Sequence, residues 1–185
     1  MAAILTHSGK LVDLLDVKPE DIYLDDIAHA LAQTCRFSGH TKRHYSVAEH
    51  SINVARLLPD PIKIYGLLHD AHEAYVGDIS TPLKRSLPVF RDWLANITDN
   101  IDEAIYAALG VPPPGTLIRD AVKYADATMA VKEMQDLFDS VPPGAEPFDG
   151  LVVPRWSIDD AEIAALINWG DSFRTAVAVA AEVCR

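Results

Sequence analysis

The sequence predicts an all-α fold, a single helical bundle that spans residues 1–185. Apolar residues recur at helical spacing through most of the chain, and prolines or glycines separate one such stretch from the next. Extended character is confined to a short segment near the N-terminus. A chain of 185 residues without internal repeats or linker-like tracts is expected to form one domain, large enough to bury a core without disulfides.

The N-terminal part is predicted to combine one short extended segment with one helix. Residues 3–13 form the extended segment. Pro19 opens an amphipathic helix that we expect to reach Cys35, because the acidic residues directly after the proline suit the positive end of the helix dipole. Residues 36–41 then break the helix.

Two helices are predicted next. Ser46 is the expected N-cap of the first, and Glu49 stands three positions later, as in a capping box. Pro59 ends this helix. The second is predicted to run without interruption from residue 61 to about residue 75.

The second half of the chain is predicted to be helical with defined stops. A turn over residues 77–82 precedes helical patterns over residues 88–109 and 116–139, which Gly110 and a run of prolines separate.

A Pro/Gly-rich loop is predicted over residues 140–156, followed by a long helix over residues 157–183. The Ala- and Val-rich end of this helix carries more apolar surface than one packed face needs, so we expect a homo-oligomer, either a dimer or a larger assembly. The alternative is a helix that closes the bundle of its own subunit.

Charge and cysteine content exclude several classes of protein. A net charge of −11 argues against a DNA or RNA polymer as partner, because such binding depends on neutralising phosphates. Cys35 and Cys184 lie far apart without a CxxC spacing, which argues against a disulfide framework and a cysteine zinc site. The N-terminal residues lack a secretory pattern and no apolar run could span a bilayer, so we expect a soluble cytoplasmic protein with no membrane partner.

The most informative segment is His69-Asp70-Ala71-His72-Glu73, which interrupts an apolar run over residues 64–68. On a continuous helix His69, Asp70 and Glu73 would share one face. A solvated polar stripe is the alternative, but the apolar flanks disfavour it. Burial of an imidazole beside a carboxylate costs several kcal/mol unless the groups are paired or coordinated. Coordination of a cation is the simplest compensation.

Two distant residues complete a candidate metal site. His50 and Asp126 each stand inside an apolar helical pattern, where an unpaired polar group is costly. Two histidines and two carboxylates suit a divalent ion such as Co, Mn, Mg, Fe, Ni or Zn. The sequence therefore predicts one divalent ion, held by His50, His69, Asp70 and Asp126.

The order of these ligands resembles that of the HD-domain metal-dependent phosphohydrolases. The similarity to the bacterial 5′-deoxynucleotidase branch covers about residues 36–127 through the motifs Arg36-Phe37, Glu49-His50-Ser51, His69-Asp70-Ala71-His72-Glu73, Gly77-Asp78, Thr81-Pro82-Leu83-Lys84 and Ala125-Asp126-Ala127. The resemblance implies an HD-type bundle and a metal-dependent enzyme that removes the 5′-phosphate from deoxyribonucleoside monophosphates with activated water. The connection between His50 and His69 is shorter than that branch leads us to expect.

The resemblance also implies roles for individual residues. Glu73 and Asp78 would handle protons at the reacting centre, and Arg36 would contact the phosphate. Two further phosphate contacts are assigned to Thr81 and Lys84. Phe37 would crowd the sugar and favour deoxyribose, and a Phe that fills ordinary core is the alternative.

Three assignments stay open. His40 and His44 lie in a basic loop that either binds the tail of a triphosphate or forms an exposed turn. His72 contacts substrate or supports a neighbouring residue, with a place beside a second ion as the alternative.

Compact phage triphosphohydrolases, notably those that act on dATP, share the ligand order, so conversion of a dNTP to nucleoside and triphosphate is the alternative reaction. A nucleotide-sensing HD module without turnover is the non-enzymatic alternative, and Glu73 and Asp78 weigh against it.

Overall fold

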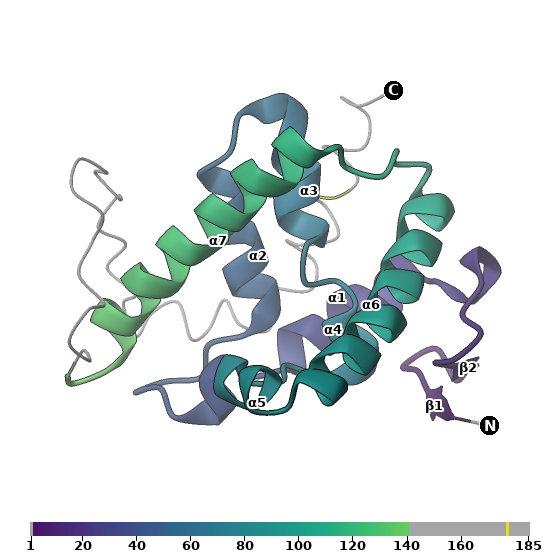
Figure 1. The fold of residues 1–185 in the computed structure, drawn as a ribbon, viewed down its shortest axis with the longest axis horizontal. Coiled ribbons are helices and arrows are strands. Elements are labelled where there is room, and N and C mark those ends of the chain that lie inside the picture. Colours follow the sequence, from purple (N-terminus) through teal and green to yellow (C-terminus); the bar gives the residue numbers. More distant parts are fainter. Residues whose placement is uncertain (1, 141–176, 178–185) are drawn as a thin grey trace.

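The computed structural model describes residues 2–140 and 177, and this part of the chain is mostly helical, as predicted (Figure 1). All but the first residue of the predicted loop over residues 140–156 lies outside the described residues. Of the predicted final helix, with its proposed oligomer surface, only Val177 is described, and it is helical and buried. Among the described helices none is long and apolar enough to cross a bilayer.

The predicted N-terminal extended segment is a β-hairpin. Strand β1 (Ala3–Leu5) pairs antiparallel with β2 (Leu11–Asp13). The hairpin is tied to the first long helix by Asp26, whose carboxylate accepts hydrogen bonds from the Ser8 amide at 2.6 Å and the Ser8 hydroxyl at 2.8 Å.

The helix predicted from Pro19 to Cys35 is two shorter elements. A 3₁₀ turn η1 (Pro19–Asp21) precedes helix α1 (Leu24–Gln33), because the two residues between them are extended. Cys35 lies beyond α1 and pairs with Ser46 in an isolated β-bridge, so the prediction that the helix reaches Cys35 is wrong.

Helix α2 (Val47–Arg56) lies at the centre of the bundle and packs on α1, on α3 (Lys63–Leu68) and on α7 (Thr116–Leu137). The Ser46 hydroxyl accepts a hydrogen bond from the Glu49 amide at 3.1 Å, which confirms the predicted N-cap. Helix α3 approaches α2 closely at Gly66, where a Cβ atom would lie only 2.9 Å from the Cα of Ala55.

The single helix predicted over residues 61–75 is wrong. The chain forms a 3₁₀ turn η3 (Asp60–Ile62), then α3, a tight turn over residues 69–72, and a short α4 (Glu73–Val76). Within the turn the amides of Ala71 and Glu73 bond to carbonyls three residues back, rather than four as in an α-helix. The break therefore falls within the His-Asp motif itself.

Helices α6 (Pro88–Leu109) and α7 agree closely with the prediction. Helix α5 (Thr81–Ser86) was not predicted and begins within the predicted turn over residues 77–82. Figure 1 shows α7 beside α2 and α3, with α6 on the other side of the bundle near η1 and α5. A polar centre lies where α2, α7 and the turn after α3 meet.

We predict that Gly66→Ala destabilises the protein by about 1–3 kcal/mol, because the added methyl group overlaps the α2 backbone at Ala55. Urea unfolding followed by circular dichroism measures the change. Gly115→Ala is the matched control, since a Cβ there meets nothing within 4 Å, and its smaller cost should come only from the weaker N-cap that alanine gives α7. Equal stability of the two variants would contradict the close packing of α3 on α2.

Candidate metal centre

The four predicted ligands converge in the structure. His50 comes from α2, His69 and Asp70 from the turn after α3, and Asp126 from α7. The Nε2 atoms of the two histidines lie 3.3 Å apart. Asp126 Oδ1 lies 3.1 Å from His50 Nε2 and 3.8 Å from His69 Nε2. Asp70 Oδ2 lies 3.7 Å and 3.2 Å from the same two nitrogens.

Both histidines are oriented for coordination by their second ring nitrogen. Nδ1 of His50 lies 2.6 Å from Oε1 of Glu133, and Nδ1 of His69 lies 2.8 Å from the carbonyl oxygen of Gly66. A proton on each Nδ1 satisfies these acceptors and leaves the Nε2 lone pairs facing one another and the two carboxylates. Metal-bound histidines show this pattern, so the residues present can hold a divalent ion.

The centre is electrostatically coupled. Burial alone would raise the pKa of Asp70, but the adjacent His69 imidazole holds it well below its ordinary value. Burial would lower the pKa of His69, and Asp70 and Asp126 raise it well above the usual range. A cation bound at this position would substitute for the positive charge that these shifts favour.

Asp126 is more accessible than its apolar flanks predict. Its side chain is 39% exposed, whereas His50 is fully buried. Asp126 is therefore the most exposed of the four predicted ligands. Burial would raise its pKa, and hydrogen bonds with His50 and His69 hold it below its ordinary value.

Glu133 is a residue of this centre that sequence reasoning missed. Its side chain is 2% exposed, and besides His50 it contacts Tyr45, whose hydroxyl donates to Oε1 at 2.8 Å, and Arg36, whose Nε donates to Oε2 at 3.2 Å. Burial would raise the pKa of Glu133, while His50 and Arg36 hold it below its ordinary value. Its spacing from Asp126, seven residues along one helix, is the signal that could have identified it.

Arg36, the predicted phosphate contact, lies inside this network. Its guanidinium is 3.5 Å from Asp70 Oδ2 as well as 3.2 Å from Glu133. Burial would lower the pKa of Arg36, and the carboxylates around it raise it above its usual value. Arg36 is therefore charged and aimed at the same corner as the ligands.

The predicted proton-handling residues lie on the α4 side of the centre. Glu73 is 4% exposed, and its Oε1 lies 4.0 Å from Lys84 Nζ. Burial and the charges of Asp70 and Asp78 raise the pKa of Glu73 to about 9. The structure thus brings Glu73, Asp78 and Lys84 together.

Two predicted substrate residues adjoin the centre through contacts of their own. His72 Nδ1 lies 3.1 Å from Asp102 Oδ1 on α6. Phe37 packs edge-on against Phe138 with ring centroids 5.3 Å apart, and the Arg36 guanidinium lies 5.4 Å from its ring centroid. Phe37 also has a φ of 53°, a left-handed backbone that only a constrained turn maintains.

The other predicted substrate residues lie at the surface. Thr81 is exposed at the first position of α5. His40 and His44 are exposed too, and the cations between them are engaged elsewhere: Arg43 pairs with Glu49 at 2.5 Å and Lys42 with Asp139 at 3.1 Å.

A pocket of about 350 Å³ opens beside the metal ligands. Its walls include His69, Asp102, Arg119 and the tyrosines Tyr65 and Tyr106, whose ring centroids lie 6.3 Å apart. Its volume is within the range of small-molecule sites, and its aromatic walls next to a polar centre suit an organic ligand.

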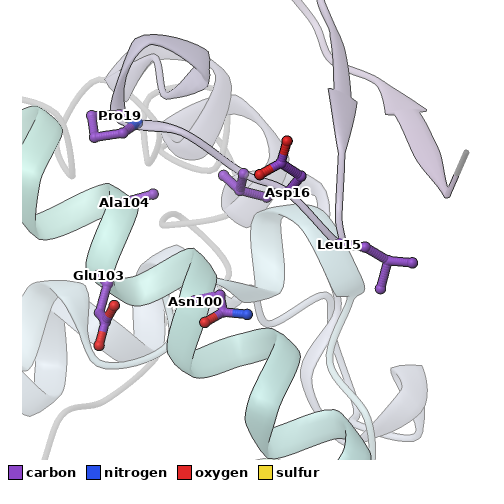
Figure 2. Close-up of a pocket in the computed structure, with 7 residues that line it drawn as sticks. Leu15, Asp16, Pro19, Asn100, Glu103 and Ala104 are labelled. Atoms are coloured by element: carbon purple, nitrogen blue, oxygen red, sulfur yellow. The ribbon is translucent and has the colours of Figure 1, made fainter.

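A second pocket of about 430 Å³ lies away from the centre, between α6 and the segment after β2 (Figure 2). Its lining combines Asp16 and Glu103 with Leu15, Ala104 and other small or apolar residues, and includes no cation or histidine. It offers no combination of groups suited to metal or phosphate chemistry.

We predict that Glu133→Gln lowers the affinity for Mn²⁺ or Co²⁺ by about 10- to 100-fold, because the amide no longer fixes the His50 ring as the carboxylate does. Isothermal titration calorimetry on metal-stripped protein measures the change. Glu103→Gln, an exposed position on α6, is the control and should bind as the unchanged protein does. An unaltered affinity in Glu133→Gln would show that Glu133 does not support His50.

Comparison with known proteins identifies the family to which the chain belongs. No family model matches the chain. Over 137 residues it is 39% identical to the uncharacterized protein YfdR of Escherichia coli, an alignment that covers 74% of this chain and 73% of that protein. It is 36% identical over 141 residues to the uncharacterized protein RCAP_rcc00048 of Rhodobacter capsulatus, with 70% of each covered. The chain therefore belongs to the same protein family as YfdR.

Proposed function

We propose that this protein is an HD-type, divalent-metal-dependent nucleotide phosphohydrolase that removes the 5′-phosphate from deoxyribonucleoside monophosphates. The observation that carries the proposal is the convergence of His50, His69, Asp70 and Asp126 from three separate parts of the chain, with a charged Arg36 beside them. Two imidazoles and two carboxylates in this arrangement are a divalent-ion site, and the guanidinium adds an anion-binding group.

The chain's own residues have distinct roles in this proposal. A divalent ion, when bound, lowers the pKa of water and polarises the phosphoryl group. Arg36 binds and orients the phosphate, and Lys84 adds positive charge at the α4 side. Glu73, with its pKa raised to about 9, carries a proton near neutral pH and is suited to donate it to the leaving oxygen. Asp78 contributes to that raised pKa through its charge.

The pocket beside His69 is the proposed place for the nucleoside. Of the described residues, its walls carry three acidic residues against the single cation Arg119, together with the two tyrosines, so the excess of negative charge disfavours phosphate and leaves the pocket for a base and sugar. The phosphate then points toward Arg36. The distribution of charge therefore sets this orientation of the nucleotide in the site.

A monophosphate suits the site better than a triphosphate. The tail of a triphosphate needs several unengaged cations, and both Lys42 and Arg43 of the 40–44 loop are held in ion pairs. The exposed His40 and His44 keep the triphosphohydrolase as the second candidate. A nucleotide sensor that keeps the pocket without turnover is the non-enzymatic candidate.

Hydrolysis of a panel of dNMPs, NMPs and dNTPs with added Mn²⁺, Co²⁺ or Mg²⁺ tests the proposal. We expect orthophosphate from dNMPs, and a loss of more than about 100-fold in Asp70→Asn, which removes a ligand oxygen and its charge. Release of triphosphate from a dNTP would show that the protein is a triphosphohydrolase and not a monophosphatase. If no product forms with any metal, the nucleotide sensor is the hypothesis that remains.

We predict that Phe37→Ala lowers the preference for dNMPs over NMPs by about 10-fold in kcat/KM, because the ring no longer crowds the 2′ position. Alanine at a φ of 53° has the same left-handed backbone strain as phenylalanine, so the substitution removes the ring without changing the backbone preference, which glycine would change. Phe90→Ala on α6 serves as the control for loss of a ring, and thermal unfolding checks both folds. An unchanged preference would assign Phe37 to packing against Phe138.

A further inference from the structure

We infer that Asp70, His72 and Glu73 form a second divalent-cation position beside the first. One ligand atom from each of these residues lies within 4.8 Å of the others. The tight turn between α3 and α4 brings them together, since its three-residue hydrogen bonds align side chains three positions apart, here Asp70 and Glu73. The inference depends on the first metal centre as its neighbour, but not on the identity of the substrate.

His72 has the anchored orientation that the two histidines of the first centre share. Its Nδ1 bonds to Asp102 at 3.1 Å, as His50 Nδ1 bonds to Glu133 and His69 Nδ1 to the Gly66 carbonyl. Within residues 2–140 and 177, no hydrogen bond involves His72 Nε2. A carboxylate that fixes one imidazole nitrogen and leaves the other for an ion is the usual support of a metal-bound histidine.

Glu73 supplies a buried oxygen that needs a partner. Oε2 is enclosed and has no hydrogen-bond partner in the described part of the chain, while Oε1 lies 4.0 Å from Lys84 Nζ. A buried carboxylate oxygen without a partner is costly. A cation between Glu73 and His72 would satisfy that oxygen directly. With this cation bound, Glu73 is an ionised ligand, so its proton-donating role in the proposed function applies to the centre that holds one ion.

Asp70 can serve both positions. Its contacts with His50, His69 and Arg36 are all made by Oδ2, so Oδ1 remains for the second cation. A carboxylate shared in this way suits two ions about 3.5–4 Å apart, the separation in two-metal hydrolytic sites. Two carboxylates with one imidazole favour a hard ion such as Mn²⁺ over Zn²⁺.

The number of bound Mn²⁺ ions tests the inference on the full chain. Metal-stripped protein is dialysed against Mn²⁺, the bound metal is counted by elemental analysis, and its electron paramagnetic resonance spectrum is recorded. We expect two ions per chain and an exchange-coupled spectrum. One ion per chain with an uncoupled spectrum at saturating Mn²⁺ would overturn the inference.

Substitutions test whether Asp70, His72 and Glu73 hold the second ion. His72→Ala should bind one Mn²⁺ with an uncoupled spectrum, whereas His29→Ala, which removes an exposed imidazole on α1, should keep two. Asp102→Asn should weaken only the second ion by about 10- to 100-fold, and it carries the test if His72→Ala does not fold. Two ions retained in both His72→Ala and Asp102→Asn would overturn the assignment.

The outcomes separate this inference from the proposed function. Phosphate release by a protein that holds one Mn²⁺ would refute the second position alone. Two coupled ions without hydrolysis of any nucleotide would refute the proposed function alone.

Discussion

The buried contact between His50 and Glu133 is the interaction on which the rest of the centre depends. It joins α2 to α7 at 2.6 Å, fixes the ring of His50 and directs its Nε2 toward His69 and Asp126. Because the same carboxylate also accepts from Arg36 and Tyr45, one side chain sets the positions of a candidate metal ligand and of the Arg36 guanidinium. A fully enclosed carboxylate is tolerated here because each of its oxygens has a partner.

Among the described residues of this centre, carboxylates outnumber permanent cations, and this imbalance accounts for the shifted pKa values. Asp70, Asp126, Glu73 and Glu133 surround the single buried Arg36, with Lys84 at the edge. Without a further positive charge the excess is relieved by protons, as the raised pKa values of His69 and Glu73 indicate. A divalent ion held by these residues would relieve the excess without protons.

Close packing of the helices adds to these polar contacts in keeping the groups in place. Gly66 lets α3 approach the α2 backbone, and this approach sets the separation between His50 and His69. The turn after α3 then places a ligand atom of Asp70 within 4.8 Å of ligand atoms of His72 and Glu73, while Asp70 Oδ2 lies 3.2 Å from His69 Nε2. The relatives in Escherichia coli and Rhodobacter capsulatus align with about three quarters of the chain or slightly less, so the family comprises more than a short shared motif.

Much of this protein was determined by its local sequence. Helical spacing and proline stops predicted α6 and α7 closely, and the Ser46 cap of α2 was predicted because capping is a short-range interaction. The four converging residues were predicted as well, since a polar group inside an apolar helical pattern needs a partner wherever it occurs. The break between α3 and α4 was not predicted, because the apolar periodicity continues across it.

Only the tertiary structure decided which distant side chains support the centre. Asp102 is a single acidic residue on a long helix, and nothing in its neighbours distinguishes it from a solvated charge. For Glu133 the one sequence signal is its seven-residue spacing from Asp126. Contact with His50 and His72 across helix interfaces gives them their roles. The partial exposure of the Asp126 side chain likewise depends on how the helices pack. Periodicity reports which face of a helix is apolar, whereas the pairing of two polar groups depends on which helices meet and at what distance.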